Sequence, residues 1–590
     1  MHRLWPALYH GVQRQYRFFP VCQQITCLMS SKPGDPTKPS DPLTKNETEN
    51  GEDTVSATSV PPSRPNAISS LPQLEDWVFR LLSNQQGRVP VSEFHKALRE
   101  VGLWENDPRL RETMANLRKL QESHSSFLDR ETFSKCITEN IVLIGRAFQS
   151  KFVIPKFSEF SSYIDKMYWS CVSQKNGKVA DYIPQLARFS PDLWGVALCT
   201  VDGQRHSIGD SDKPFCLQSC VKPLVYATAV SELGDKTVHK YVGTEPSGRS
   251  FNEIALNKYN QPFNPMINSG AILLCSLIKP EDHQSDRFDH ILKVLKAAAG
   301  DDFVGFSNTT FLSEKATSYR NFALAYYLKE NQCFPPKTDL MEALDLYLQH
   351  CSVDITCESG AIIAATLANG GVCPLTGELV FHPDAVQHTL SLMHSCGMYD
   401  YSGQFAFQVG LPAKSGVSGG IMLVVPSVMG IMCWSPPLDS TGNSVRGLHF
   451  CKELVSTFNF HHYDNLKYKS KKLDPRRHSL YTMRGRSFRD ESRSQQIIDI
   501  LFAAYNGDVT ALRRCVMLGM DMEVTDYDGR TALHLAAAEG HVQVVRFLLE
   551  KCGVRHDLQD RWGQVPLDDA VRFGHKETEE ILRKAQEQSG

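Results

Sequence analysis

Apolar residues between positions 69 and 147 recur at intervals of three and four, which places them on one face of a helix. The pattern is clearest at Leu74, Trp77, Val78, Leu81 and Leu82. Further amphipathic runs follow near 93–102, 108–120 and 130–147. The spacing therefore predicts a small helical domain over residues 69–147.

Residues 148–462 alternate between continuous apolar runs and helical stretches, which favours one large α/β domain. The most apolar window, Gly419–Trp434, is too short to span a bilayer and is interrupted by Pro426 and Gly430. It predicts two buried strands joined by a turn. No transmembrane segment is expected.

The C-terminal region contains an internal repeat. The segment DGRTALHLAAAEGH at 528–541 returns as WGQVPLDDAVRFGH at 562–575, and 501–514 is a less regular copy. This pattern resembles the ankyrin repeat, whose characteristic positions are occupied here by Thr531, Leu533, His534, Ala536 and Gly540. We expect ankyrin repeats over 496–586, and a protein partner for them.

Residues 1–34 contain no Asp or Glu, yet Arg3, Arg14, Arg17 and Lys32 lie among apolar residues. This composition is typical of a mitochondrial transit peptide and predicts location in the mitochondrial matrix, with a disordered basic tail as the alternative. Residues 35–68 are rich in polar residues and Pro, and predict a disordered linker.

A second linker is predicted at 463–495. Between Lys467 and Arg489, nine basic residues accompany one acid, Asp474, and Pro475 interrupts any helix. A solvated basic linker explains this composition better than an anion-binding segment.

The composition of the chain limits the classes of function that it can have. The chain has 590 residues, enough for several domains, and a formal charge of −3 that gives no reason to expect nucleic acid as a partner. Its 17 cysteines form no CxxC pair, so we expect reduced thiols. We predict no metal, because His10, Cys216, Cys220 and the histidines at 461–462 form no ligand spacing.

The segment LLSNQQGRVPVSEF in the helical domain resembles an EF-hand loop. Gly87 stands at the sharp turn and Glu93 at the last ligand position. Leu82 and Gln86 occupy positions at which that loop requires oxygen anions, so we expect a structural helix pair without calcium.

Ser219 and Lys222 are candidates for chemistry, because a spacing of three places a hydroxyl and an amine on one face of a helical turn. Pro223 is compatible only if the helix begins just before it. The spacing alone is weak evidence, since Ser276 and Lys279 repeat it inside an apolar run where packing is the better explanation. Cys220, next to Ser219, is a rival nucleophile without a lysine at this interval.

Several ordered segments, among them FCLQSCVKPL, PFNPMINSGAI, SEKATSYRN and SCGMYDYSGQFAFQVGLPAKSGVSGG, together resemble the serine-dependent glutaminases, most closely the animal mitochondrial ones. The resemblance runs from about residue 70 to the C-terminus. It implies a catalytic domain similar to the serine β-lactamases and penicillin-binding proteins, in which a Ser-x-x-Lys helix start faces a Lys-Ser-Gly strand, here 414–416.

The resemblance also implies roles for individual residues. Ser219 would attack the glutamine carboxamide, Lys222 would activate it, Tyr399 would assist proton transfer and Tyr182 would line the pocket. Substrate-binding positions are Ser219, Asn268, Glu314, Asn321, Tyr347, Tyr399 and Val417. Gln218 lies nearby. Glu314 would bind the α-ammonium, and the backbone N–H groups of Ser219 and Val417 would form an oxyanion hole.

The expected reaction is hydrolysis of L-glutamine to glutamate and ammonia through a glutamyl-serine intermediate, without metal or organic cofactor. The resemblance implies a homotetramer, a dimer of dimers, with phosphate as an activator acting through the loop at 248–261. Glu253 and Ala255 stand where kidney-type members carry a basic and an aromatic residue, so we expect an altered phosphate response nearer the liver-type pattern. The alternatives are a penicillin-recognising or esterase-like serine enzyme and an inert scaffold for the ankyrin repeats.

Overall fold

The computed structural model describes residues 71–122, 126–248, 252–464, 472–477, 497–517 and 520–589. The predicted transit peptide 1–34 and linker 35–68 lie outside the described residues, as does most of the predicted linker 463–495. No helix in the described ranges has both the length and the apolar character needed to cross a bilayer.

The first part is the expected helical domain. Its helices are α2 (Leu71–Leu82), α3 (Val91–Glu100), α4 (Arg111–Glu122), α5 (Arg130–Ile137) and α6 (Ile141–Phe148), with short 3₁₀ turns η1 (Pro108–Leu110) and η2 (Thr138–Asn140). The strands β1 (Val89–Pro90) and β2 (Phe127–Leu128) pair antiparallel between two helix pairs, as in an EF-hand domain. Gly87 has φ +68°, which confirms the sharp turn expected there.

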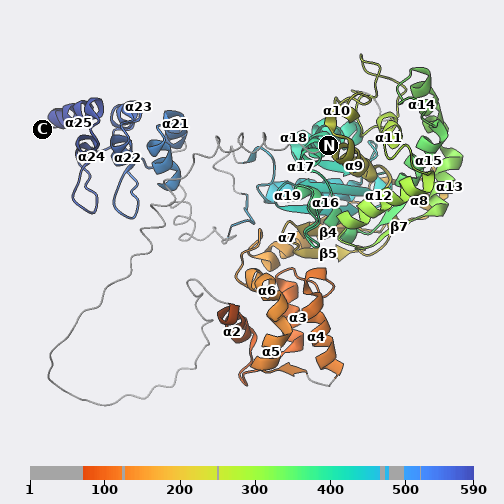
Figure 1. Ribbon diagram of the computed structural model, residues 1–590, viewed down its shortest axis with the longest axis horizontal. Helices are drawn as coiled ribbons and strands as arrows, with labels where there is room; N and C mark the ends of the chain where they lie inside the picture. The colour runs from red at the N-terminus through yellow and green to blue at the C-terminus, as the bar shows by residue number, and fades with distance from the viewer. Residues whose placement is uncertain are drawn as a thin grey trace, which may run out of the picture. The chain divides into compact units, whose positions relative to one another are not determined.

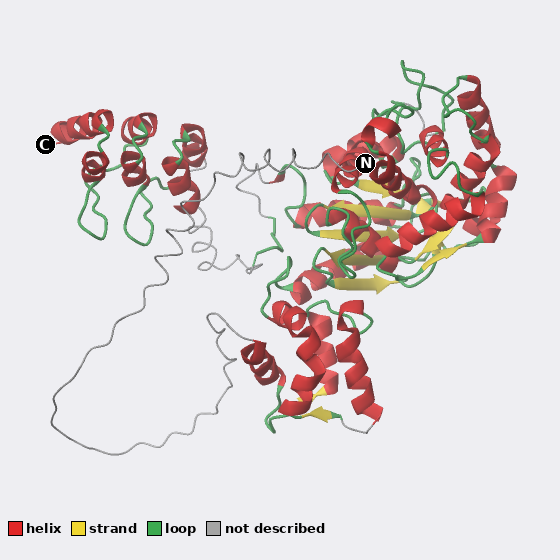
Figure 2. Ribbon diagram, in the orientation of Figure 1, coloured by secondary structure: helices red, strands yellow, loops and turns green. Residues whose placement is uncertain are grey.

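Figure 2 shows that the sheet of the central part is enclosed by helices. It has five strands in the order β5-β4-β11-β10-β9, and every neighbouring pair is antiparallel. The strands are β4 (Gly195–Thr200), β5 (Arg205–Gly209), β9 (Ala413–Ser415), β10 (Gly420–Val425) and β11 (Met429–Trp434). The apolar window at 419–434 is therefore two buried strands, as predicted.

Different helices cover the two faces of the sheet (Figure 1). On one face, Met422, Val424 and Met432 pack with α16 (Cys357–Ala368) and α9 (Lys222–Leu233). On the other, Ile421, Leu423 and Ile431 pack with α7 (Phe157–Val172) and α19 (Val445–Thr457). Because strand side chains alternate between faces, β4, β10 and β11 contribute to both cores, which explains why their sequences are apolar throughout.

Helix α16 approaches β11 closely at Gly430. A Cβ added there would lie 2.1 Å from the backbone nitrogen of Ala365. We expect Gly430→Ala to lower the free energy of unfolding by about 1–3 kcal/mol, because backbone atoms must move to admit the methyl group. The measurement is a urea titration followed by tryptophan fluorescence. Gly403→Ala is the control, since its added Cβ meets nothing within 4 Å; equal midpoints for the two variants would contradict the prediction.

The central part contains further helices, 3₁₀ turns and short strands. The helices are α8 (Pro184–Ala187), α10 (Asp235–Val238), α11 (Asn268–Cys275), α12 (Gln284–Ala298), α13 (Asn308–Thr317), α14 (Tyr319–Glu330), α15 (Leu340–Cys351), α17 (Pro383–Cys396) and α18 (Ser402–Gln408). The 3₁₀ turns are η3 (Gln218–Val221) and η4 (Tyr399–Tyr401). Two small sheets join β6 (Phe215–Cys216), β8 (Val353–Ile355) and β7 (Val304–Phe306), and β12 (Pro437–Leu438) with β3 (Lys178–Val179).

The C-terminal part consists of stacked helices with their own core, as expected for ankyrin repeats. They are α21 (Val509–Met517), α22 (Ala532–Ala538), α23 (Val542–Arg546), continued by one π-helical turn (Phe547–Lys551), α24 (Pro566–Phe573) and α25 (Lys576–Ser589). Thr531 caps α22, and its hydroxyl accepts a hydrogen bond from the backbone N–H of His534. These are two of the residues that carried the sequence assignment.

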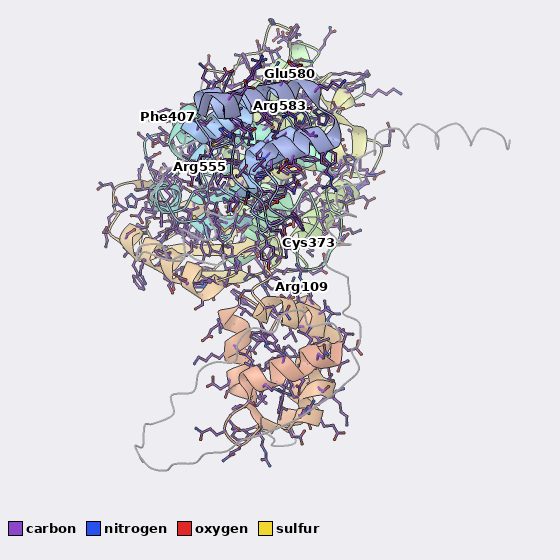
Figure 3. All side chains as sticks on the ribbon, turned by 90° about the vertical axis from the view of Figure 1, so that its left-hand side faces the viewer. Arg109, Cys373, Phe407, Arg555, Glu580 and Arg583 are labelled. Atoms are coloured by element: carbon purple, nitrogen blue, oxygen red, sulfur yellow. The ribbon has the colours of Figure 1, made fainter. Side chains whose placement is uncertain are left out.

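Hydrogen bonds attach the helical domain to the central part. The Arg109 guanidinium, labelled in Figure 3, donates to the carbonyl of Asp202 at 2.7 Å and is held by Asp107 at 2.8 Å. The Trp104 indole donates to the carbonyl of Arg205 at 2.9 Å. The buried Asp107 thus orients a cation toward backbone carbonyls of the loop between β4 and β5.

Candidate active site

Ser219 and Lys222 lie on the turn that starts α9. Ser219 is in η3, and α9 begins at Lys222 with Pro223 directly after it. Proline is favoured in the first turn because the N–H it lacks has no partner within the helix there, so the expected helix start is confirmed. The Ser219 residue is 8% exposed and Lys222 is 1% exposed. Both side chains are therefore almost completely withdrawn from water.

Two residues of this region have left-handed backbone conformations that non-glycine residues rarely adopt. Gln218, just before Ser219, has φ +49°, and Tyr399 has φ +52°. Such strain costs about 1–3 kcal/mol per residue and persists only where the surrounding structure enforces it. Both residues contact charged side chains: Gln218 donates to Glu314, and the Tyr399 ring faces Lys414.

The Tyr399 side chain is hydrogen-bonded to Ser219, although the two residues belong to separate 3₁₀ turns. Burial raises the pKa of the Tyr399 phenol, and the hydrogen bond to Ser219 opposes this rise. The phenol therefore stays protonated at neutral pH. It can donate a proton to, or pass one from, the serine hydroxyl.

The Lys222 ammonium makes a short hydrogen bond across the pocket. Its Nζ donates to Oδ1 of Asn268 at 2.6 Å, and Nδ2 of Asn268 donates to Oδ1 of Asn321 at 3.0 Å. Burial lowers the pKa of Lys222 to about 8. A substantial fraction of this amine is consequently neutral near physiological pH, which is what a general base requires.

Glu314 supplies the carboxylate of the pocket. Its Oε1 accepts hydrogen bonds from the Tyr182 hydroxyl at 2.7 Å and from Nε2 of Gln218 at 2.8 Å. Burial raises the pKa of Glu314, and these two hydrogen bonds oppose the rise. Neither donor carries a charge, so the carboxylate has no salt-bridge partner among these contacts. It is suited to receive a cationic group of a ligand.

Tyr182 and Tyr347 bound the pocket in different ways. The Tyr182 residue is 46% exposed while its hydroxyl reaches inward to Glu314, so its ring lies at the boundary with solvent. Tyr347, on α15, is buried, and its ring centroid lies 5.8 Å from Nζ of Lys222. This distance suits a cation–π contact with the protonated amine.

The strand β9 brings a second buried lysine to the site. Lys414 is paired with Met422 and therefore points to the same sheet face as that residue, toward α9. Its Nζ lies 4.5 Å from the ring centroid of Tyr399 and donates to the carbonyl of Ser415 at 2.7 Å. Burial, followed by the charge of Lys222, lowers the pKa of Lys414 to about 7. Lys414 was expected on this strand, but no role was predicted for it.

The turn after β9 contains Val417, which is partly buried, packs against Ile183 and Leu186, and precedes β10. Gly416 allows this turn to approach the serine, since an added Cβ would lie 2.8 Å from the carbonyl of Leu217. All nine site residues named from the sequence are thus present around α9, η4 and the turn after β9, on elements separated widely along the chain.

The other candidates for the nucleophile and its lysine, Cys220 and the Ser276–Lys279 pair, have structural roles. The Cys220 thiol donates to the carbonyl of Lys414 at 3.3 Å, and burial raises its pKa to about 11, so it is not a thiolate. The Ser276 hydroxyl donates to the carbonyl of Leu273 at 2.6 Å just after α11, while Lys279 is exposed. The second serine–lysine interval is therefore packing, as expected.

The site combines a buried hydroxyl, a buried amine of lowered pKa and a carboxylate, next to an antiparallel sheet covered by helices. These are features of hydrolytic enzymes that use a serine nucleophile. The family models that match the chain are Glutaminase over residues 177–463, EF-hand domain over 74–155, and Ankyrin repeats (3 copies) over 500–589.

Two similar sequences agree with the glutaminase match. The mitochondrial liver isoform of glutaminase from Mus musculus is 56% identical over 87% of this chain and 84% of its own length. A putative glutaminase from Caenorhabditis elegans is 49% identical over 87% and 85%. A solved structure of a probable glutaminase is 39% identical, covers 51% of this chain and 97% of its own, and has a TM-score of 0.49. The chain belongs to the glutaminase family and is a glutaminase.

Proposed function

We propose that this chain hydrolyses L-glutamine to L-glutamate and ammonia by covalent catalysis at Ser219. The serine oxygen attacks the carboxamide carbon while the neutral Lys222 amine accepts its proton. Tyr399, hydrogen-bonded to Ser219, relays the proton to the departing nitrogen, which leaves as ammonia. Water then attacks the glutamyl-serine ester and releases glutamate. The observation that supports this scheme most strongly is the burial of Lys222 three positions after Ser219.

Selectivity for a free amino acid follows from the charges of the pocket. Glu314 binds the α-ammonium, because it is a buried carboxylate whose present partners, Tyr182 and Gln218, are neutral. Asn268, Asn321 and Tyr347 supply the polar groups that hold the α-carboxylate and orient the carboxamide. An esterase or a penicillin-recognising enzyme does not need a carboxylate that binds an α-ammonium. Ammonia release from glutamine, compared with asparagine and with a chromogenic β-lactam, distinguishes these activities.

The oxyanion of the tetrahedral intermediate requires donors that are fixed before the reaction. We assign this role to the backbone N–H groups of Ser219 and Val417, because Gly416 lets the turn after β9 approach η3. Loss of one such donor costs about 10²–10³-fold in turnover.

The pH dependence tests the role of Lys222. Below a pKa of about 8 the amine is protonated and cannot accept the serine proton, so kcat/KM should rise with pH to a midpoint near 8. The measurement is initial ammonia release at subsaturating glutamine across pH. Lys222→Arg should remain inactive at every pH, because the guanidinium does not lose its proton in this range. A rising limb that persists in this variant would assign the titration to another group.

The assembly and its regulation are further parts of the proposal. A homotetramer in the mitochondrial matrix, activated by phosphate, is what the family resemblance implies, and the relatives' names support the mitochondrial location. Residues 249–251 of the loop at 248–261 lie outside the described residues; Glu253 and Ala255 follow them. We expect phosphate to activate less strongly than in a kidney-type enzyme, as measured by titration together with size-exclusion chromatography. Equal activation would contradict the importance of these two positions.

A further inference from the structure

A cluster of three different metal-binding side chains lies outside the active site. Cys171 is near the end of α7, and His449 and Glu453 are four positions apart on α19, which places them on the same helix face. Both helices cover the sheet face opposite α9. The cluster is therefore separated from Ser219 by the sheet.

The geometry of this cluster suits a single ion. One donor atom from each of the three residues lies within 4.8 Å of the other two, and Nε2 of His449 is 3.1 Å from Oε1 of Glu453. A tetrahedral zinc ion with bonds of 2.0–2.3 Å has ligand atoms about 3.3–3.8 Å apart, so a small side-chain adjustment is sufficient. Among the residues that the structure describes, no other group of three or more His, Cys, Asp or Glu side chains has this spacing.

An ion can reach the cluster from solvent, and a neighbouring hydroxyl orients one of its side chains. Cys171 is fully buried at the base, whereas the His449 and Glu453 side chains are 37% and 32% exposed, so an ion can enter from solvent. The Ser170 hydroxyl donates to Oε2 of Glu453 at 2.5 Å and leaves Oε1 directed at His449. Such an outer hydrogen bond fixes the orientation of a ligating carboxylate.

We propose that Cys171, His449 and Glu453 form a binding site for a divalent transition-metal ion of the zinc type, with water as the fourth ligand. A thiolate and an imidazole select this class of ion over magnesium or calcium. On binding, the Cys171 S–H bond breaks, its proton passes to solvent and a sulfur–metal bond forms. Thiolate and carboxylate then neutralise the charge of the ion. The ion links α7 to α19 and takes no part in glutamine hydrolysis.

No metal was expected from the sequence, because its cysteines and histidines show no ligand spacing. This site combines residues from α7 and α19, which lie near the two ends of the catalytic domain in the sequence. Ser170 and Glu453, for example, are 283 positions apart. No local motif connects them.

The test uses the full-length chain stripped of metal with a chelator. Zinc is titrated in competition with a chromophoric chelator, and cobalt(II) is added separately to detect a thiolate-to-cobalt charge-transfer band. We expect one tight equivalent of zinc, a charge-transfer band, and a higher thermal midpoint with zinc. Cys171→Ser should remove the band and the thermal shift. His449→Gln and Glu453→Gln, which change partly exposed side chains, should each weaken zinc binding by about tenfold or more.

The matched control is His290→Gln. His290 and Glu232 form a similarly exposed pair, 2.6 Å apart, that belongs to no such cluster of three. This variant should bind zinc as the parent does, and all four variants should keep glutaminase activity. The proposal is overturned if the parent binds no tight equivalent, or if His449→Gln and Glu453→Gln bind zinc as tightly as the parent. A loss equally large in His290→Gln also overturns it.

Discussion

Ser219→Ala is expected to reduce ammonia release from glutamine by about 10⁶-fold, as removal of the nucleophile does in a serine protease. The physical reason is that the rest of the pocket can still bind substrate but offers no oxygen that Lys222 can activate. KM should change little in comparison, because the contacts of Glu314, Asn268 and Asn321 remain. The measurement is steady-state ammonia production, with the folded state checked by the thermal midpoint.

Cys220→Ser is the matched control for this experiment. The Cys220 thiol is the neighbouring nucleophile, but it donates to the carbonyl of Lys414 and is kept protonated by burial. Activity within a few-fold of the parent is expected. If Ser219→Ala stays active and Cys220→Ser does not, the nucleophile is the thiol and the proposed mechanism is wrong.

Glu314→Gln should lower kcat/KM for glutamine by about 10²–10³-fold, since removing one partner of a buried charge pair costs about 2–5 kcal/mol. The glutamine side chain has the same shape and retains an oxygen that accepts from Tyr182, so the pocket should stay folded. What disappears is the charge opposite the α-ammonium. The measurement is kcat/KM for glutamine and for an analogue that lacks the α-amino group.

The parent should strongly prefer glutamine over this analogue, and Glu314→Gln should lose most of that preference. Glu330→Gln, at the exposed end of α14, is the control and should keep it. If the preference survives in Glu314→Gln, another group binds the ammonium. Ser219 could then still be the nucleophile, so the two experiments test separate parts of the proposal.

The sequence predicted those features that depend on residues close together along the chain. The continuous apolar window interrupted by Pro426 predicted two strands, and β10 and β11 are those strands. Pro223 predicted where α9 begins, and the repeat at 528–541 predicted the ankyrin helices. Most site residues, in contrast, were predicted from resemblance to a family; Ser219 and Lys222 had also been candidates on their spacing. Asn268, Glu314 and Asn321 are common polar residues whose own spacing indicates no pocket.

The sequence by itself determined the parts of this protein: a helical pair of EF-hand type, a mixed central domain and a repeat array, because periodicity, turn residues and repeats act over short distances. Only the tertiary structure decided which charges are buried together. It placed Lys414 against Tyr399 and gave Lys222 a lowered pKa, and it joined Cys171 to His449 across two helices. These properties depend on loss of water and on contacts between distant segments, and neither is encoded in any local pattern of residues.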